Sequence, residues 1–266
     1  MSWSGLVTVV TGASAGIGEE IALQLASAGA RLVLAARRRD ELDRVALRCR
    51  STRAEVLVVP TDVSDQAQCA ALIETSVRSF GRLDVLVNNA GQGMWGRVEE
   101  MKDLSVYETM LRVNYLSAVW CTTAALPHLK ATRGRILTVG SVSGLTGVPL
   151  RSGYAAAKHA LTGFMDTLRI EIEEDGVSVT MIHPGFVSTG SQARNLGPEG
   201  KVLGQMPVKP LGGHTPQETA RALLDAGLAR KRDSIPGWRS ALGLKMRPFF
   251  PGLIDSMVSK AIRGKK

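Results

Sequence analysis

Residues 6–18, LVTVVTGASAGIG, decide the fold of this chain. A short run of apolar and β-branched residues ends at a glycine, and a glycine-rich turn follows it. Beyond the turn, Ile17, Ile21 and Leu25 recur at the spacing of one helix face, and Gly29 supplies a stop signal. This stretch therefore predicts a strand, a glycine turn and a helix.

The same alternation of apolar runs and helical segments recurs along the chain. We expect helices over about 38–52, after a cap at Ser64, from near Asp103 and from Gly153 onward. Apolar strands that alternate with helices indicate a parallel sheet covered on both faces. The predicted fold is a doubly wound, Rossmann-type sheet with three α/β/α layers. Its further strands are expected in RLVLAA (31–36), AEVLVVP (54–60), LDVLVNNAG (83–91), GRILTVGS (134–141) and VSVTMIHPG (177–185).

The length of 266 residues and a hydrophobic content of 44% suit one well-buried domain. We assign residues 1–230 to this domain and residues 231–266 to a basic amphipathic C-terminal extension. Within the domain, residues 188–214 are rich in glycine and proline but also carry apolar side chains such as Leu196 and Leu203. Long irregular segments in compact domains are usually functional or disordered. The apolar side chains favour a mobile substrate lid.

The net charge of +9 is concentrated at the C-terminus. From Arg230 to Lys266 there are ten Lys or Arg and two Asp, so this segment carries +8 and the rest of the chain +1. A globally basic nucleic-acid-binding protein is therefore not expected, and we predict no nucleic-acid partner.

The extension also carries an apolar stripe. One hypothesis is that this stripe docks on its own domain or on a neighbouring subunit. The alternative is an interfacial helix that contacts an anionic membrane surface. The stripe consists of Leu253, Ile254, Met257, Val258, Ala261 and Ile262.

The three cysteines are scattered, and with the four histidines they form no metal-ligand spacing. We therefore expect neither a disulfide framework nor a metal. The first strand begins close to Met1, and no apolar run reaches the length of a membrane span. These features predict a cytoplasmic protein without a cleavable signal.

The glycine turn has the spacing of a phosphate-binding loop. Gly12 is followed by Ser14 and then by Gly16, Ile17 and Gly18 at the expected start of the helix. Glycines allow the backbone to approach a pyrophosphate closely, and the helix N-terminus offers free N–H groups. A dinucleotide cofactor is therefore predicted.

The end of the second strand indicates which dinucleotide binds. NAD sites place an acidic residue there, but this chain has Ala36 followed by Arg37, Arg38 and Arg39. Asp40 comes too late, because it should already lie in the helix. Cations at a helix N-terminus are unfavourable unless an anion is bound. We therefore expect NADP(H) in preference to NAD(H), with Arg37 and Ser14 on the extra phosphate.

Further along, Ser141 precedes Tyr154 by thirteen positions, and Lys158 follows Tyr154 by four. In a helix, residues four apart lie on one face, so the phenol and the amine would lie side by side. A phenol titrates near 10 in water, and a neighbouring ammonium favours the phenolate. The three groups could protonate and polarise a carbonyl oxygen. Ser143 is a second candidate for the hydroxyl.

Together these motifs resemble the short-chain dehydrogenase/reductase family, in family order over about residues 5–190. The resemblance implies that Tyr154 is the general acid/base, that Lys158 binds the nicotinamide ribose and acidifies the phenol, and that Ser141 polarises the carbonyl. It places Asn114 at a water of a proton relay. The matching motifs are TGASAGIG (11–18), TDVSD (61–65), NNAG (88–91), VNYLSA (113–118), YAAAK (154–158) and HPGFVST (183–189).

The resemblance also implies a set of cofactor contacts. Asp62 and Val63 would flank the adenine, and the NNAG segment would line the channel through Asn89, Ala90 and Gly91. The turn at Pro184 and Gly185 would present the N–H of Val187 to the carboxamide, with Thr189 nearby.

The resemblance further implies a substrate pocket between Ser141 and Tyr154. Apolar residues there favour a hydrophobic ketone or aldehyde, or the corresponding alcohol. The runner-up is a 3-oxoacyl-carrier-protein reductase, and a third hypothesis is a non-catalytic NADP(H) sensor. Family members are often homodimers or homotetramers, which we expect here. The expected pocket residues are Met94, Trp95, Leu145, Val148, Pro149 and Leu150.

Overall fold

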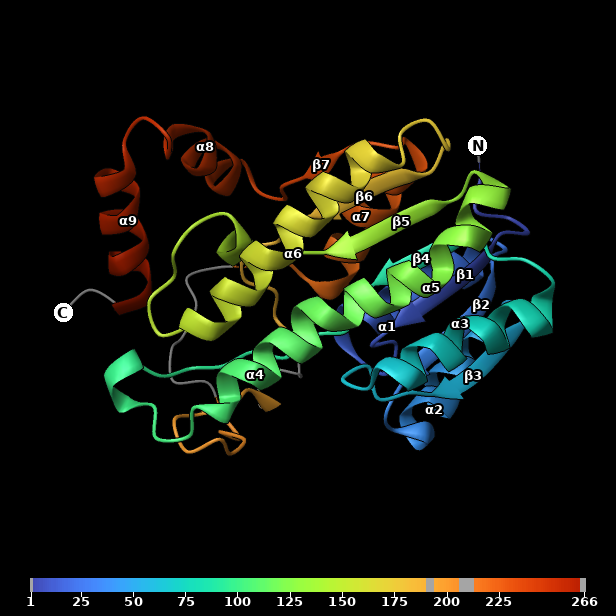
Figure 1. Cartoon of the computed structure of the whole chain (residues 1–266), viewed down its shortest axis with the longest axis horizontal. Helices are drawn as coiled ribbons and strands as arrows, with labels where there is room; N and C mark the ends of the chain where they lie inside the picture. Colours follow the sequence, from blue (N-terminus) through green and yellow to red (C-terminus); the bar gives the residue numbers. More distant parts are fainter. Residues whose placement is uncertain (1, 190–193, 206–212, 264–266) are drawn as a thin grey trace.

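A computed structural model describes residues 2–189, 194–205 and 213–263, and its centre is a parallel sheet in the order β3-β2-β1-β4-β5-β6-β7 (Figure 1). The chain starts in the middle of the sheet, moves to one edge, returns beside β1 and proceeds to the other edge. The predicted fold is confirmed. The strands are β1 (Val7–Thr11), β2 (Arg31–Ala36), β3 (Val56–Pro60), β4 (Val85–Asn88), β5 (Arg135–Val139), β6 (Ser178–Ile182) and β7 (Asp233–Ser234).

Helices cover both faces of the sheet (Figure 1). Helices α1, α2 and α7 pack on one face, while α3, α5 and α6 pack on the other. Because side chains alternate along a strand, Val10 of β1 contacts the first group and Val9 the second. The helices are α1 (Gly16–Ser27), α2 (Arg39–Arg50), α3 (Gln66–Phe80), α4 (Ser105–Leu111), α5 (Ser117–Thr132), α6 (Ser152–Glu171) and α7 (Pro216–Leu228).

Two details differ from the sequence-based expectations. The helix expected from near Asp103 is interrupted by a π-helical turn, η2 (Arg112–Leu116), between α4 and α5. The cap of α3 is Asp65 rather than Ser64, because the Asp65 carboxylate accepts the N–H groups of Ala67 and Gln68. The Ser64 hydroxyl instead donates to Asp62 Oδ1 at 2.8 Å.

The longest described part of the predicted lid, residues 194–205, folds against the segment after β4. Leu196 pairs with Met94, and the Trp95 N–H donates to the Leu196 carbonyl at 2.9 Å. Lys102 forms an ion pair with Glu199 at 2.7 Å. Residues 190–193 and 206–212 of the predicted lid lie outside the described residues.

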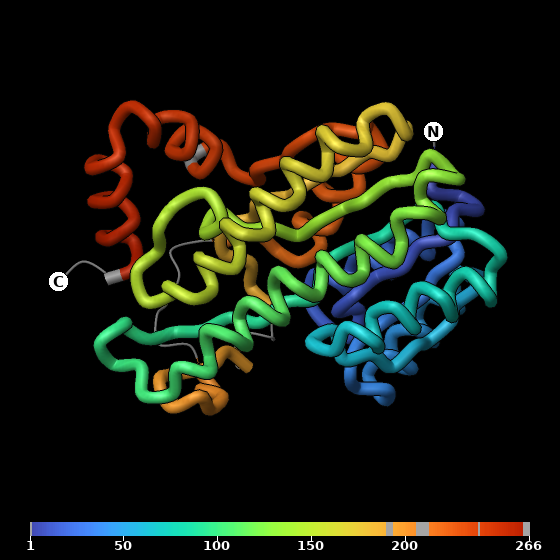
Figure 2. The backbone as a smooth tube through the Cα atoms, in the orientation of Figure 1, coloured from blue at the N-terminus to red at the C-terminus, as the bar shows by residue number. Residues whose placement is uncertain are grey.

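The C-terminal extension forms two helices, α8 (Trp238–Met246) and α9 (Pro251–Arg263), at one end of the molecule (Figures 1 and 2). Figure 2 shows them beside the loop that precedes α6, where Arg247 Nη1 donates to the Leu145 carbonyl at 3.0 Å. No helix in the described residues is long and apolar enough to cross a membrane.

Candidate active site

A cleft of about 430 Å³ opens at the carboxyl ends of β1, β4, β5 and β6. It lies where the chain direction across the sheet reverses, between β1 and β4, which is where open α/β sheets bind ligands. The cleft brings together all the predicted catalytic and cofactor-binding residues: Gly12, Ser14, Gly16, Ile17, Gly18, Arg37, Asp62, Val63, Asn89, Ala90, Gly91, Asn114, Ser141, Tyr154, Lys158, Pro184, Gly185, Val187 and Thr189.

The glycine turn is built for close approach. Gly12 and Gly16 have φ values of 67° and 60°, which favour glycine. A Cβ at Gly18 would lie 2.3 Å from the Gly12 carbonyl oxygen, so only glycine lets α1 begin so close to β1. No side chain caps α1 at Ala15, so its first N–H groups are directed at the cleft without a capping partner among the described residues.

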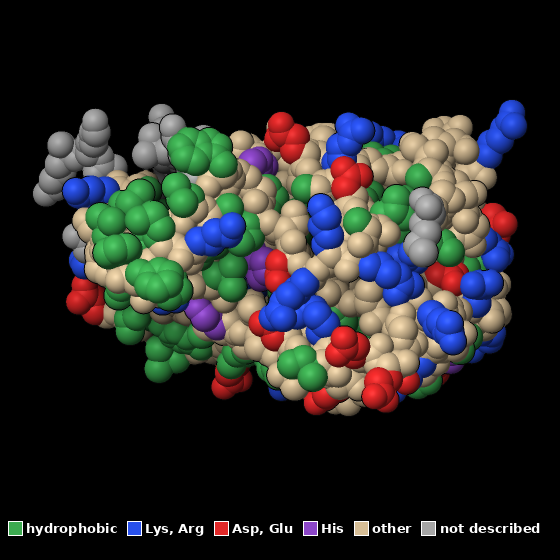
Figure 3. All heavy atoms as spheres, turned by 90° about the horizontal axis from the view of Figure 1, so that it is seen from above, with side chains coloured by type: hydrophobic (Ala, Val, Ile, Leu, Met, Phe, Trp, Pro, Cys, Tyr) green, Lys and Arg blue, Asp and Glu red, His purple; other side chains and the backbone are tan. Residues whose placement is uncertain are grey.

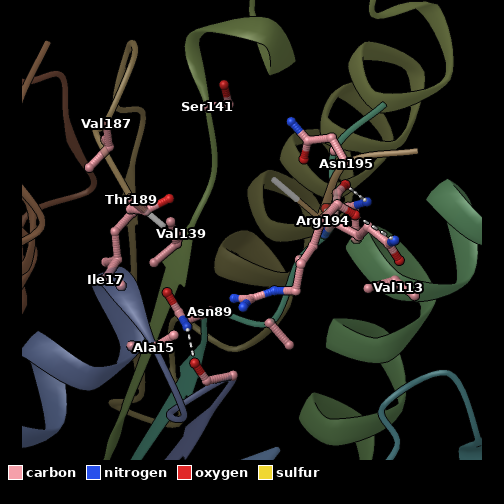
Figure 4. Close-up of a pocket in the computed structure, with 18 of the residues that line it drawn as sticks. Ala15, Ile17, Asn89, Val113, Val139, Ser141, Val187, Thr189, Arg194 and Asn195 are labelled. Atoms are coloured by element: carbon pink, nitrogen blue, oxygen red, sulfur yellow. Dashed lines mark hydrogen bonds between the residues drawn. The ribbon is translucent and has the colours of Figure 1, made fainter. Parts of the chain in front are cut away.

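The loop after β4 is fixed to the end of β1 by the Asn89 side chain (Figure 4). Asn89 Nδ2 donates to the carbonyls of Thr11 and Gly12 at 2.9 and 3.2 Å. The Thr11 hydroxyl in turn accepts the N–H groups of Asn89 and Ala90. These bonds fix the loop after β4 against the end of β1.

Three arginines gather at the end of the cleft beside β2. Arg37 and Arg38 follow Ala36, and Arg194 approaches them from residues 194–205. Burial lowers the pKa of Arg194, and the charges of Arg38 and Arg37 lower it further, while Glu41 opposes them. In Figure 4 the Arg194 side chain reaches from beside Asn195 towards Val139 and Asn89. Asp40 lies in the first turn of α2 and is not among the residues that line the cleft.

Helix α6 places Tyr154 and Lys158 on the same wall. Lys158 is 4% exposed, and its Nζ donates to the Val139 carbonyl at 2.8 Å. The same Nζ lies 5.8 Å from the centroid of the Tyr154 ring. Ser141, at the end of β5, lines the cleft and interacts with the Tyr154 hydroxyl, whereas Ser143 is not among the lining residues. The geometry thus selects Ser141 over Ser143.

The electrostatics of this wall favour ionisation of the phenol. Burial raises the pKa of Tyr154, but Lys158 and Arg151 act in the opposite direction, and so does the hydrogen bond with Ser141. The net pKa lies below 10. Burial, opposed by attraction to Tyr154, also lowers the pKa of Lys158. A phenol of lowered pKa can exchange protons more readily near neutral pH.

Asn114 lies in the π-helical turn and is 1% exposed. Its Nδ2 donates to the carbonyls of Gln92 and Met110 at 2.9 and 3.1 Å, and its Oδ1 accepts the Gln92 N–H at 3.2 Å. These bonds satisfy a buried polar side chain in an otherwise apolar segment. The amide fixes the loop after β4 against α4 and the π-helical turn, while its place in a proton relay stays a prediction.

The substrate side of the cleft differs from the sequence-based expectation. Of the six predicted pocket residues, only Trp95 lines the cleft, because Met94 is fully buried and the loop 145–150 turns towards the C-terminal extension. Arg151 and Asn195 line it instead. Sequence reasoning missed Arg151, although its place three residues before Tyr154 and near the start of a helix was a usable signal.

The comparisons with known proteins agree with this geometry. A model of the family "short chain dehydrogenase" matches residues 6–198, which is well over half of the chain. The chain is a short-chain dehydrogenase/reductase. It is therefore an oxidoreductase that acts on CH–OH groups with a nicotinamide cofactor.

Its curated relatives include both reductases and hydroxysteroid dehydrogenases. Dehydrogenase/reductase SDR family protein 7-like of Anopheles gambiae is 36% identical over 86% of this chain and 74% of that protein. The 11-beta-hydroxysteroid dehydrogenase of Pinus massoniana is 38% identical over 94% of this chain and 72% of that protein. 11-beta-hydroxysteroid dehydrogenase-like 4A from Arabidopsis thaliana is 42% identical, and the chain spans only 64% of the length of that protein.

Solved structures of similar fold hold either form of the cofactor. A short chain dehydrogenase/reductase from Burkholderia phymatum in complex with NAD superposes with a TM-score of 0.84, 26% identity and coverage of 95% of this chain and 96% of that one. The alcohol dehydrogenase from Thermococcus sibiricus complexed with 5-hydroxy-NADP gives a TM-score of 0.76 and 31% identity over 87% of this chain and 96% of that one.

Proposed function

We propose that the protein is an NADP(H)-dependent reductase that converts a hydrophobic ketone or aldehyde to an alcohol, or catalyses the reverse oxidation. The observation that carries this proposal is the phenol of Tyr154 on the cleft wall, beside the ammonium of Lys158 and the hydroxyl of Ser141. The apolar lining residues Val113, Val139 and Phe186 suit a hydrophobic substrate.

The cleft fits a dinucleotide phosphate. The glycine turn and the uncapped start of α1 would hold the pyrophosphate, and Asp62 and Val63 would lie beside the adenine. Arg37, with Arg38 and Arg194 nearby, would bind the extra phosphate, which supports NADP(H) over NAD(H). When bound, the cofactor supplies or accepts the hydride.

The residues of this chain then stabilise the charge that develops on the substrate oxygen and exchange a proton with it. In the reducing direction Tyr154 donates its phenolic proton to the carbonyl oxygen, and Ser141 donates a hydrogen bond to the same atom. Both contacts are stronger in the transition state than in the ground state, because negative charge develops on that oxygen. Lys158 stabilises the resulting phenolate. In the oxidising direction the phenolate accepts the proton of the alcohol.

The test is NADPH and NADH oxidation by purified protein across a graded series of ketones and aldehydes, compared with a Tyr154→Phe variant. We expect turnover with NADPH, a preference for apolar carbonyls, and a loss of about 10²- to 10⁴-fold in kcat on substitution. If the variant still binds NADPH, as followed by the fluorescence of NADPH, its cofactor site is intact. If wild type and variant are equally inert with every carbonyl, the sensor hypothesis replaces this one.

A further inference from the structure

Arg151 introduces a positive charge into the substrate side of the cleft. It immediately precedes α6, and its guanidinium carbon lies 4.1 Å from the centroid of the Tyr154 ring and 4.9 Å from that of Trp95. Two aromatic rings therefore contact this guanidinium and restrict its rotamers. The Leu150 backbone has a φ of 68°, and its carbonyl accepts the Gly96 N–H at 2.9 Å, so the turn that presents Arg151 is also fixed.

This guanidinium has no acidic partner in the described residues. Its buried Nε has no hydrogen-bond partner among them, and Tyr154 is the one group among them that favours its charged form. Burial dominates and lowers the pKa of Arg151. Segments 190–193 and 206–212 contain no Asp or Glu, so they cannot supply a side-chain carboxylate either.

Such an arrangement is costly unless a ligand completes it. A buried or half-buried charge is stable when it is paired, and a cation next to a helix N-terminus is unfavourable. The neighbouring Trp95 is 5% exposed, and its Nε1 has no hydrogen-bond partner among the described residues. Two donors thus lie in the same wall of the cleft with no acceptor from the described chain.

We propose that Arg151 recognises an anionic group on the substrate, so that the substrate is a largely apolar carbonyl compound that also carries a carboxylate. This inference rests on the proposed reductase function and narrows its substrate class. The planar guanidinium matches a carboxylate in a two-point hydrogen bond, while its faces stay on Trp95 and Tyr154. The rest of the substrate contacts the apolar lining residues near the phenol.

The competing explanation is that Arg151 acts only through Tyr154, as a second cation that acidifies the phenol. The two explanations differ in what they do to substrate choice. A cation that binds the substrate changes the ratio of acidic to neutral substrates. A cation that only acidifies Tyr154 changes the pH profile for both substrates alike.

The deciding experiment compares 4-formylbenzoate with its methyl ester as substrates for the NADPH-loaded enzyme. Wild type, Arg151→Met, Arg151→Lys and a surface control, Arg112→Met, are each assayed for kcat/KM. We expect Arg151→Met to lower the acid-to-ester ratio of kcat/KM by about 10- to 100-fold, with Arg151→Lys in between and Arg112→Met equal to wild type. An unchanged ratio in Arg151→Met overturns the proposal, even if the pH profile shifts.

A second readout does not need turnover. In the presence of NADP⁺, benzoate should raise the thermal midpoint of the wild-type protein more than benzamide does, and Arg151→Met should abolish the difference. Equal stabilisation by the two compounds in wild type contradicts the anion site. If no carbonyl is reduced but benzoate still stabilises wild type more than Arg151→Met, the proposed reductase function is wrong and the proposed anion site is supported. Arg151→Lys decides the question if Arg151→Met does not fold.

Discussion

Tyr154 lies between two cations, and its chemistry depends on both. Lys158 lies one helical turn beyond it, and Arg151 contacts the face of its ring. Burial raises the pKa of the phenol, but the two charges and the hydrogen bond with Ser141 together lower it below its usual value. The pKa of the phenol therefore depends on Lys158 and Arg151 near the start of α6 and on Ser141 at the end of β5.

Replacement of Lys158 by Met should shift the oxidation reaction towards alkaline pH. Alcohol oxidation needs the phenolate form of Tyr154, so kcat/KM rises with pH through the pKa of this group. Without the ammonium that pKa moves upward, and the inflection follows it. The measurement is kcat/KM for a secondary alcohol against pH in wild type, Lys158→Met and Arg112→Met. An inflection that stays in place in Lys158→Met would show that Lys158 does not acidify the phenol.

Arg37 should determine the choice of cofactor. It follows Ala36 at the end of β2 and lines the cleft, whereas Arg39 lies in α2, 3.6 Å from Asp43. Replacement of Arg37 by Ala should therefore reduce kcat/KM for NADPH by about 10- to 100-fold and change that for NADH little. Arg39→Ala is the matched control and should leave both values near wild type. A parallel loss for both cofactors in Arg37→Ala would contradict binding of the extra phosphate.

At the scale of elements, the sequence predicted those parts of the fold that local physics determines. The glycine turn, the buried strands and α6 follow from periodicity and from the conformational demands of Gly12 and Gly16. The π-helical turn around Asn114 did not follow, because it is stabilised by bonds from the amide to Gln92 across the structure. Five of the six expected pocket residues do not line the cleft, and one of them, Leu145, has a contact that periodicity does not reveal, because its carbonyl accepts a hydrogen bond from Arg247 of the C-terminal extension.

Helices α1 and α2 are connected by an ion-pair cluster around Glu19. Its carboxylate bonds with Arg44 at 2.8 Å and with Arg48. The hydrogen bond from Arg44 has the largest effect on the pKa of Glu19, and although burial opposes it, the net pKa lies below the usual 4.5. A carboxyl group of lowered pKa stabilises the fold above its unfolded-state pKa, and this contribution is lost as the pH falls through the folded-state value.

Glu19→Gln should therefore destabilise the protein at pH 7 and matter less in acid. Because both arginines are about half exposed, we expect a loss of about 1 kcal/mol at pH 7, discounted for solvent screening. The difference should shrink as the pH falls below about 4.5, where the wild-type carboxylate is also lost. Urea unfolding at pH 7 and below about pH 4.5 measures the difference in stability between wild type and Glu19→Gln. Glu74→Gln, at an exposed position, is the control. A difference that is independent of pH would point to packing rather than charge.

At the scale of the whole molecule, the C-terminal extension leaves apolar side chains uncovered. Figure 3 shows hydrophobic side chains gathered at the end of the molecule that carries α8 and α9. Ile254 of the predicted stripe is 6% exposed and packs near α8, but Leu253 and Met257 are more than half exposed. The stripe is therefore only partly buried among the described residues, and its contact at Ile254 is with α8 of the same extension. The exposed apolar residues of this end are Trp238, Leu242, Phe249, Phe250, Leu253 and Met257.

We propose that this surface, with Lys245 and Lys260 nearby in sequence, contacts anionic membranes and brings the cleft close to lipophilic substrates. The protein should then co-sediment with vesicles of phosphatidylserine and phosphatidylcholine and be released by salt, because exposed charges are screened. A variant with Phe249, Phe250 and Leu253 changed to Ser should lose binding. Leu47→Ser, an exposed apolar residue of α2, is the control. The alternative is that wild type does not bind the vesicles and that light scattering gives a lower molar mass for the triple variant than for wild type. In that case the surface packs against a second copy of the chain.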